Sequence, residues 1–222
     1  MRPDQRTNTS VRTMGSGLGY LSRADGSAKF QFGKSSVLCA VNGPMAVKQR
    51  DELMDKAYIS VSFTPLVGKG TTLDRLYERI LEKIATLVII DALHPRTMIR
   101  ISFQVLADDG SILTTAVNAM MLALLDAGVP LNSTFAGVTT MVHTDGRLLL
   151  DPTVIELEEA QSVHNFVFDA ISGNCIATNS TGVYTKEEFD GSYELASLAC
   201  QSIHGFFKAA VKHKIEKEQG KE

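Results

Sequence analysis

The segment from Leu113 to Leu125 restricts the possible folds of this chain more than any other part of the sequence. When it is drawn as a helix, apolar side chains lie on nearly every face. A helix that is apolar all round is normally buried on all sides. Thr114, Thr115 and Asn118 interrupt the run, which is shorter than the roughly 20 apolar residues of a membrane span. We therefore expect a central core helix and no association with a membrane.

An acidic turn, Asp108-Asp109-Gly110-Ser111, directly precedes this helix. The N–H groups at the start of a helix have no partners within the helix, so such a position can bind an anion. Whether this turn binds one is the main functional question that the sequence poses.

The hydrophobic pattern of the remaining chain predicts one α+β domain over residues 1–222, with helices packed on sheet. Alternating or continuous apolar runs predict strands at residues 20–21, 28–32, 36–41, 58–63, 99–105, 135–142, 148–150, 163–168 and 175–178. Helical spacing predicts a further helix over residues 73–88, which begins at a capping box formed by Thr71 and Asp74. A last helix is expected from about Thr185.

Three segments are expected to lie outside regular structure. Residues 15–19 contain too many glycines for a regular strand. Residues 1–14 are polar and basic and are expected to form a mobile N-terminal arm, while residues 212–222 alternate in charge and are expected to form a frayed C-terminal tail.

Composition excludes several functional classes. The net charge of −3 gives no global basic field, so any contact with RNA needs a local basic patch. The three cysteines are far apart in the sequence, which argues against a disulfide framework and fits a reducing compartment. The histidines lack the spacing of zinc ligands, so neither a metal site nor a cofactor is expected.

A basic loop and helix face could contact phosphates. Lys69 lies in a glycine-flanked loop that lacks the spacing of a nucleotide-binding loop. Arg75 and Arg79 follow one turn apart on the outer face of the next helix. They could bind RNA phosphates or form a solvated face that neighbouring acidic residues partly neutralise.

An acidic cluster, formed by Asp151, Glu156, Glu158 and Glu159, follows a predicted strand. Such carboxylates can act as a general acid or hold a divalent ion. They can equally form an ordinary acidic turn and helix start, and composition alone favours that reading.

Several motifs, in their order and spacing, carry a resemblance to a known family. They are Arg2-Pro3-Asp4-Gln5-Arg6, Arg23-Ala24-Asp25-Gly26-Ser27-Ala28, Val41-Asn42-Gly43-Pro44, Leu93-His94-Pro95-Arg96-Thr97, Asp108-Asp109-Gly110-Ser111, the segment from Leu122 to Pro130, and Leu150-Asp151-Pro152-Thr153. With these motifs the chain resembles the ribonuclease PH family. The resemblance implies the ribonuclease PH fold, with two βαβ-type halves whose mixed sheets pack on helices, and assembly into a six-membered ring.

The resemblance also implies a degenerate active site. Active members have Gly-Thr-Arg, which holds the attacking phosphate, where this chain has Ser111-Ile112-Leu113. Leucine offers no charge to an anion. Active members also carry two aspartates six positions apart; Asp151 matches the first, and Leu157 stands at the second. We therefore do not expect phosphorolysis.

The resemblance thus implies a non-catalytic subunit of the RNA exosome core ring, which supports 3'-to-5' RNA processing and turnover. Its partners would be related subunits of a hetero-hexameric ring, RNA-binding cap subunits, a catalytic exosome nuclease and single-stranded RNA. Lys69, Arg75 and Arg79 would line the RNA path, and the protein would occur in nucleus, nucleolus and cytoplasm. Two alternatives stay open: a homodimeric nuclease that acts alone, phosphorolytic or metal-dependent, with Asp151 and Glu156, or a different inactive ring subunit.

Overall fold

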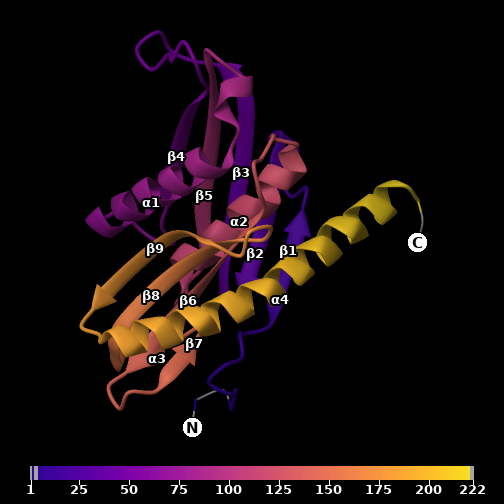
Figure 1. Ribbon diagram of the computed structural model, residues 1–222. Coiled ribbons are helices and arrows are strands. Elements are labelled where there is room, and N and C mark those ends of the chain that lie inside the picture. The colour runs from indigo at the N-terminus through magenta and orange to yellow at the C-terminus, as the bar shows by residue number, and fades with distance from the viewer. Residues whose placement is uncertain (1, 3–4, 221–222) are drawn as a thin grey trace.

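The computed structural model describes residue 2 and residues 5–220 (Figure 1). The first half of the chain contains β1 (Met14–Leu18), β2 (Gly26–Phe32), β3 (Ser35–Ala46), β4 (Tyr58–Thr64), α1 (Thr72–Val88), the short η1 (Asp91–Leu93), β5 (Thr97–Ala107) and α2 (Ile112–Ala127). The second half contains β6 (Phe135–His143), β7 (Leu148–Leu150), α3 (Val154–Glu158), β8 (Ala160–Asp169), β9 (Cys175–Gly182) and α4 (Lys186–Glu218). The chain therefore alternates sheet and helix as expected for an α+β domain.

The strands form two sheets. The first has the order β1-β2-β3-β5-β4 and is mixed, because β4 and β5 are parallel and α1 connects them. The second has the order β7-β6-β8-β9 and is antiparallel throughout. A βαβ crossover is thus present in the first half, whereas the second half is an antiparallel sheet followed by α4.

Helix α2 lies at the centre, between the two sheets (Figure 1). It packs on β2 and β3 with one side and on β6 with the other, while α4 covers the opposite face of the second sheet. Its residues from Leu113 to Leu124 are all buried. The prediction of a central helix surrounded by protein is confirmed.

The polar residues of α2 connect it to the second sheet. Asn118 accepts a hydrogen bond from the Gly137 amide at 2.8 Å and donates one to the Gly137 carbonyl at 2.9 Å. The Thr114 hydroxyl lies 2.8 Å from that of Thr139 on β6. Buried polar groups need such partners, so Thr114 and Asn118 help to fix the register between helix and sheet, whereas the Thr115 hydroxyl donates to the Ser111 carbonyl of its own turn.

Helix α1 begins with the expected capping box, in which Thr71 and Asp74 satisfy each other's backbone amides. Its apolar side is wider than the surface beneath it. Leu81, Ile84, Ala85 and Val88 are buried, but Leu73, Leu76 and Leu87 are exposed. These three leucines share the helical spacing of the apolar side but stay exposed, because α1 packs on β4, which is the edge strand of its sheet.

Helix α4 begins after Thr185, as predicted, and continues further than expected. It is helical to Glu218, so the described part of the segment from residue 212 is not frayed. Lys214 forms ion pairs with Asp126 at the end of α2 and with Glu218. These contacts keep the last turns of the helix ordered beyond the sheet that supports its first half (Figure 1).

The glycine-rich segment forms β1, contrary to expectation. Met14 to Leu18 pair antiparallel with β2 through backbone hydrogen bonds, which glycine can make as well as any residue. A Cβ atom on Gly15 would lie 2.6 Å from the Gln31 side chain, and one on Gly17 would lie 2.3 Å from the Tyr20 ring. The glycines therefore leave room for neighbouring side chains.

Candidate functional site

The turn before α2 packs tightly against the segment that follows β7. Ser111 is the N-cap of α2 in a left-handed conformation, with φ 58°, and its side chain does not cap the helix. Instead, the Ser111 hydroxyl donates to the Pro152 carbonyl at 3.1 Å. Gly110 has φ 86°, and a Cβ there would lie 2.7 Å from the same carbonyl oxygen. The structure thus brings together the two segments expected to form the site.

A cavity of about 230 Å³ opens beside this turn. Its lining includes Ser111, Ile112 and Leu157, together with Asp74, Tyr77 and Asp108. Among the described residues that line it, none is a lysine or an arginine. The pKa of Tyr77 is raised by burial and further by the charges of Asp108 and Asp74. The two carboxylates disfavour a negative charge on the Tyr77 side chain, and for the same reason they disfavour a phosphate in the cavity.

Leu113 does not face this cavity. Its side chain is buried in the core, and it lines a small internal gap with Ile80 and Val117. The position that the resemblance aligns with a phosphate-binding arginine therefore serves packing in this chain.

Asp151 is held by an arginine from the N-terminal segment. Arg12 Nε lies 2.9 Å from Asp151 Oδ2, Arg12 Nη2 lies 2.6 Å from Oδ1, and the Arg12 amide donates to Oδ2 at 3.0 Å. Arg6 Nη1 is 3.8 Å from Oδ2. Burial lowers the pKa of Arg12, but the hydrogen bond to Asp151 and the charges of Asp151, Asp109 and Glu156 together outweigh burial, so the pKa of Arg12 is raised. Both carboxylate oxygens are thus engaged within the protein.

Glu156 is held in the same way by Arg2. Arg2 Nε and Nη2 donate to its two oxygens at 2.7 and 2.9 Å, and the Thr153 amide donates at 2.9 Å. Burial alone would raise the pKa of Glu156, but the hydrogen bonds from Arg2 and from the Thr153 backbone outweigh it and the pKa is lowered. Glu156 also closes the capping box of α3 with Thr153, as in the helix start that composition favoured, while Arg2 and Arg12 bind the two carboxylates to the N-terminal segment.

The remaining acidic residues of the cluster lie apart from this pair. Glu158 is exposed, and the carboxylate of Glu159 lies 2.8 Å from the His143 ring. In the part of the chain that the structure describes, histidine, cysteine and acidic side chains do not gather in a group of three or more able to hold a metal ion. None of the described helices has the length and apolar character needed to cross a bilayer.

The paired arginines hold the N-terminal segment against α3, which does not fit the mobile arm expected for residues 1–14. Arg2 and Arg12 are each only 6% exposed. Pro3 and Asp4 of the first motif lie outside the described residues. These arginines were missed as site residues, although Arg2 belongs to the first family motif and a basic segment and an acidic cluster occur in one chain.

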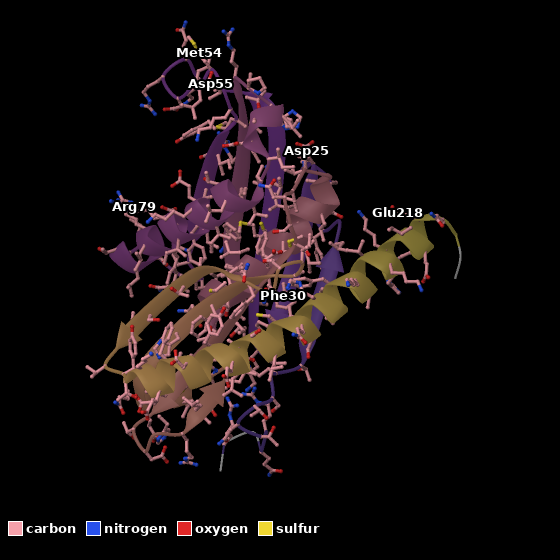
Figure 2. All side chains as sticks on the ribbon, in the orientation of Figure 1. Asp25, Phe30, Met54, Asp55, Arg79 and Glu218 are labelled. Carbon is pink, nitrogen blue, oxygen red and sulfur yellow. The ribbon has the colours of Figure 1, made fainter. Side chains whose placement is uncertain are left out.

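The basic candidates are exposed on two adjoining segments, and none of them lines the cavity. Lys69 is exposed in the loop between β4 and α1, and Arg75 and Arg79 are exposed on α1 (Figure 2 labels Arg79). Neither arginine forms an ion pair with another described residue. The acids expected to neutralise them are partly occupied elsewhere: Asp74 caps α1, and Glu78 accepts from the Phe63 amide at 2.9 Å. These hydrogen bonds hold the two carboxylates away from direct ion pairs with the arginines but leave their negative charge in place.

Comparison with known proteins identifies the family. The family model described as "3' exoribonuclease family, domain 1" matches residues 10–130, which is more than half of the chain. The chain belongs to the ribonuclease PH family. The matched region runs from the N-terminal segment through β1–β5 and ends just after α2, and it includes the turn from Asp108 to Ser111.

Relatives extend the ribonuclease PH match over nearly the whole chain. The "Exosome complex exonuclease RRP46 homolog" of Oryza sativa subsp. japonica is 32% identical and the match covers 95% of each chain. The "Exosome complex component RRP46" of Saccharomyces cerevisiae is 29% identical and the match covers 84% of this chain and 89% of that protein.

Solved structures confirm the ribonuclease PH fold. A crystal structure of rice Rrp46 superposes with a TM-score of 0.88 at 30% identity, covering 93% of this chain and 98% of that one. An Archaeoglobus fulgidus exosome with RNA bound to the active site matches with a TM-score of 0.77 at 18% identity, covering 93% and 92% of the two chains. At that identity the second match shows the fold alone.

Proposed function

We propose that this ribonuclease PH-family protein is a non-catalytic structural subunit of the RNA exosome core ring, which supports 3'-to-5' RNA processing and degradation. Relatives similar over most of the chain are named exosome components, and the fold is that of exosome ring proteins. The observation that carries the non-catalytic part is the cavity beside α2. It presents Asp74 and Asp108 beside the turn that the resemblance aligns with the phosphate-binding Gly-Thr-Arg of active members, and Leu113 is turned into the core.

The ring would contain related subunits, which contact this chain through strand edges and helix faces. RNA-binding cap subunits and a separate catalytic nuclease would complete the complex, which would act in nucleus, nucleolus and cytoplasm. Co-purification of the tagged chain tests this directly. Stoichiometric recovery of related ring subunits is the expected result, whereas recovery of the chain as an isolated homodimer would contradict ring membership.

The alternative is a homodimeric nuclease that acts alone with Asp151 and Glu156. The structure disfavours it, because Arg12 and Arg2 each bind both oxygens of one carboxylate. A metal ion or substrate would have to displace a buried arginine from its carboxylate. The displacement would leave the arginine charge uncompensated, at a free-energy cost of about 3–5 kcal/mol.

Incubation of the purified chain with RNA separates the two functions. With inorganic phosphate, or with magnesium or manganese, we expect the RNA to stay intact. Release of nucleoside diphosphates would refute the non-catalytic assignment. Metal-dependent hydrolysis that is lost in the Asp151→Asn variant would establish the alternative. Circular dichroism at the assay temperature must show that this variant is folded.

Lys69, Arg75 and Arg79 would contribute to the RNA path of the ring. Their side chains are exposed on adjoining segments, so an RNA strand could reach all three phosphate-binding groups. In a reconstituted ring, replacing all three with glutamate should weaken binding of single-stranded RNA and shorten the protected length. If each contacts one phosphate, the slope of log affinity against log salt concentration should fall by about 2 in magnitude.

A matched control separates a local contact from a general charge effect. Replacing the exposed Lys34, Lys186 and Lys217 with glutamate changes the net charge by the same amount at positions away from α1. Rings with this control should protect RNA like the unmodified ring. Equal loss in both triple variants, or unchanged protection in the first, would remove these residues from the RNA path.

A further inference from the structure

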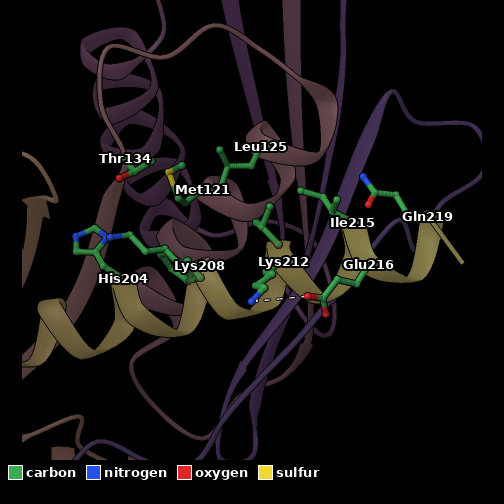
Figure 3. A pocket seen from close by; sticks show the side chains of 11 residues that line it. Met121, Leu125, Thr134, His204, Lys208, Lys212, Ile215, Glu216 and Gln219 are labelled. Atoms are coloured by element: carbon green, nitrogen blue, oxygen red, sulfur yellow. Dashed lines mark ion pairs between the residues drawn. The ribbon is translucent and has the colours of Figure 1, made fainter. Parts of the chain in front are cut away.

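A groove lies between the C-terminal half of α4 and the end of α2 (Figure 3), whereas the Ser111 turn lies at the start of α2. Its volume is about 560 Å³. The floor is apolar and is formed by Met121, Leu125, Phe207, Val211 and Ile215. Leu125 and Ile215 are 36% and 46% exposed, so apolar surface remains open to solvent.

Polar groups lie along one side of this groove. His204, Lys208 and Lys212 follow each other at intervals of four residues on α4, so they share one face of the helix (Figure 3). Lys208 is exposed and forms no ion pair with another described residue. Lys212 lies 3.7 Å from Glu216, but this pair is 78% and 47% exposed and therefore weak. The polar side of the groove thus offers positive charge.

His204 does not add a reachable polar atom to this side. Its Nε2 atom is buried and has no hydrogen-bond partner, and the ring also lines a second cavity with Phe168 and Asp169. The positive charge of the polar side therefore comes from Lys208 and Lys212.

We propose that the groove binds an amphipathic segment of a partner protein, with apolar side chains on the groove floor and carboxylates opposite Lys208 and Lys212. The shape favours a peptide segment, because the lining runs from His204 to Gln219 on α4, which at 1.5 Å per residue is about 22 Å or four helical turns. Apolar anchors in an elongated groove are the usual way to bind an amphipathic segment. The charge of the rim selects an acidic one.

A selection with defined probes tests this proposal on the full chain. Random 12-residue peptides displayed on phage are selected for binding to the immobilised protein, and the affinity of the enriched peptides is measured by fluorescence anisotropy. We expect enriched sequences to combine apolar residues with aspartate or glutamate. Their affinity should fall at least tenfold for Lys208→Glu and for Ile215→Asp. Lys186→Glu changes the same charge outside the groove and should leave binding unchanged.

Three results would overturn the proposal. One is that no peptide is enriched, or that enriched peptides bind both groove variants as tightly as the original protein. A second is equal enrichment of basic and acidic peptides. The third is a dimer in analytical ultracentrifugation that Ile215→Asp dissociates, since a second copy of the chain would then occupy the groove. Circular dichroism of each variant separates loss of binding from loss of folding.

Discussion

The Arg12–Asp151 pair gives the sharpest test of whether this site is structural or catalytic. Replacing Asp151 with asparagine keeps the size of the side chain and one acceptor oxygen but removes the charge that faces Arg12. The backbone should tolerate the change, because Asp151 has φ 50° and asparagine is among the residues that adopt this conformation most readily. The variant therefore isolates the effect of charge.

The size of the effect follows from the burial of the pair. The side chains of Arg12 and Asp151 are 5% and 1% exposed. Removing one partner of a buried pair costs about 3–5 kcal/mol. Arg12 keeps contacts with the carbonyl of Asp109 at 2.7 Å and with its carboxylate at 3.5 Å, so we expect the lower end of this range. For a chain of this length, about 3 kcal/mol lowers Tm by about 6–12 °C.

Urea unfolding at pH 7, followed by far-UV circular dichroism, measures this change because the protein contains no tryptophan. A double-mutant cycle with Arg12→Met separates the pair from its surroundings. The double variant should be less destabilised than the sum of the single variants by about 2 kcal/mol, because it leaves neither charge unpaired.

Two results would refute this reasoning. If Asp151→Asn unfolds within about 0.5 kcal/mol of the original protein, as surface substitutions do, the pair does not anchor the N-terminal segment. If the stabilities of the single variants simply add in the double variant, Arg12 and Asp151 are not coupled.

The remaining predictions concern the core. Asn118→Leu should cost about 2–4 kcal/mol in urea unfolding, because both polar groups of the buried Gly137 backbone lose their partner. Leu113→Arg should not restore phosphate-dependent RNA cleavage and should lower the yield of soluble protein, because its charge would be buried without a partner. Burial lowers the pKa of His164 in the folded protein below that in the unfolded chain. As the pH drops below about 6.5, the unfolded chain therefore binds the proton more readily, and the free energy of unfolding should fall. His164→Gln should flatten the stability profile between pH 6.5 and 5.5, and an unchanged slope would contradict this assignment.

Much of the fold follows from local patterns in the sequence. The apolar segment from Leu113 to Leu125 could only be a buried helix, and the capping residues Thr71 and Thr185 mark the starts of α1 and α4. The patterns did not reveal how much of each helix the adjoining sheet covers. Leu73 is exposed because α1 covers an edge strand, and periodicity gives the apolar face of a helix but not the width of the surface beneath it.

The candidate site was predictable in its position but not in its contacts. The resemblance placed Ser111 and Asp151 in one region, and the structure brings their segments together. It could not show that Asp151 is buried against Arg12, since the two residues are 139 positions apart and each alone is an ordinary polar residue. Long-range ion pairs of this kind depend on tertiary packing, for which the spacing of residues carries no signal.

The central position of α2 has a consequence for how the chain unfolds. One side of the helix completes the packing of the first sheet, and the other side completes that of the second. The family match ends at residue 130, just after α2, yet a fragment cut there would expose the side of the helix that β6 covers. The two sheets therefore cannot open separately, and hydrogen exchange should show α2, β2 and β6 as one cooperative unit that opens only with global unfolding.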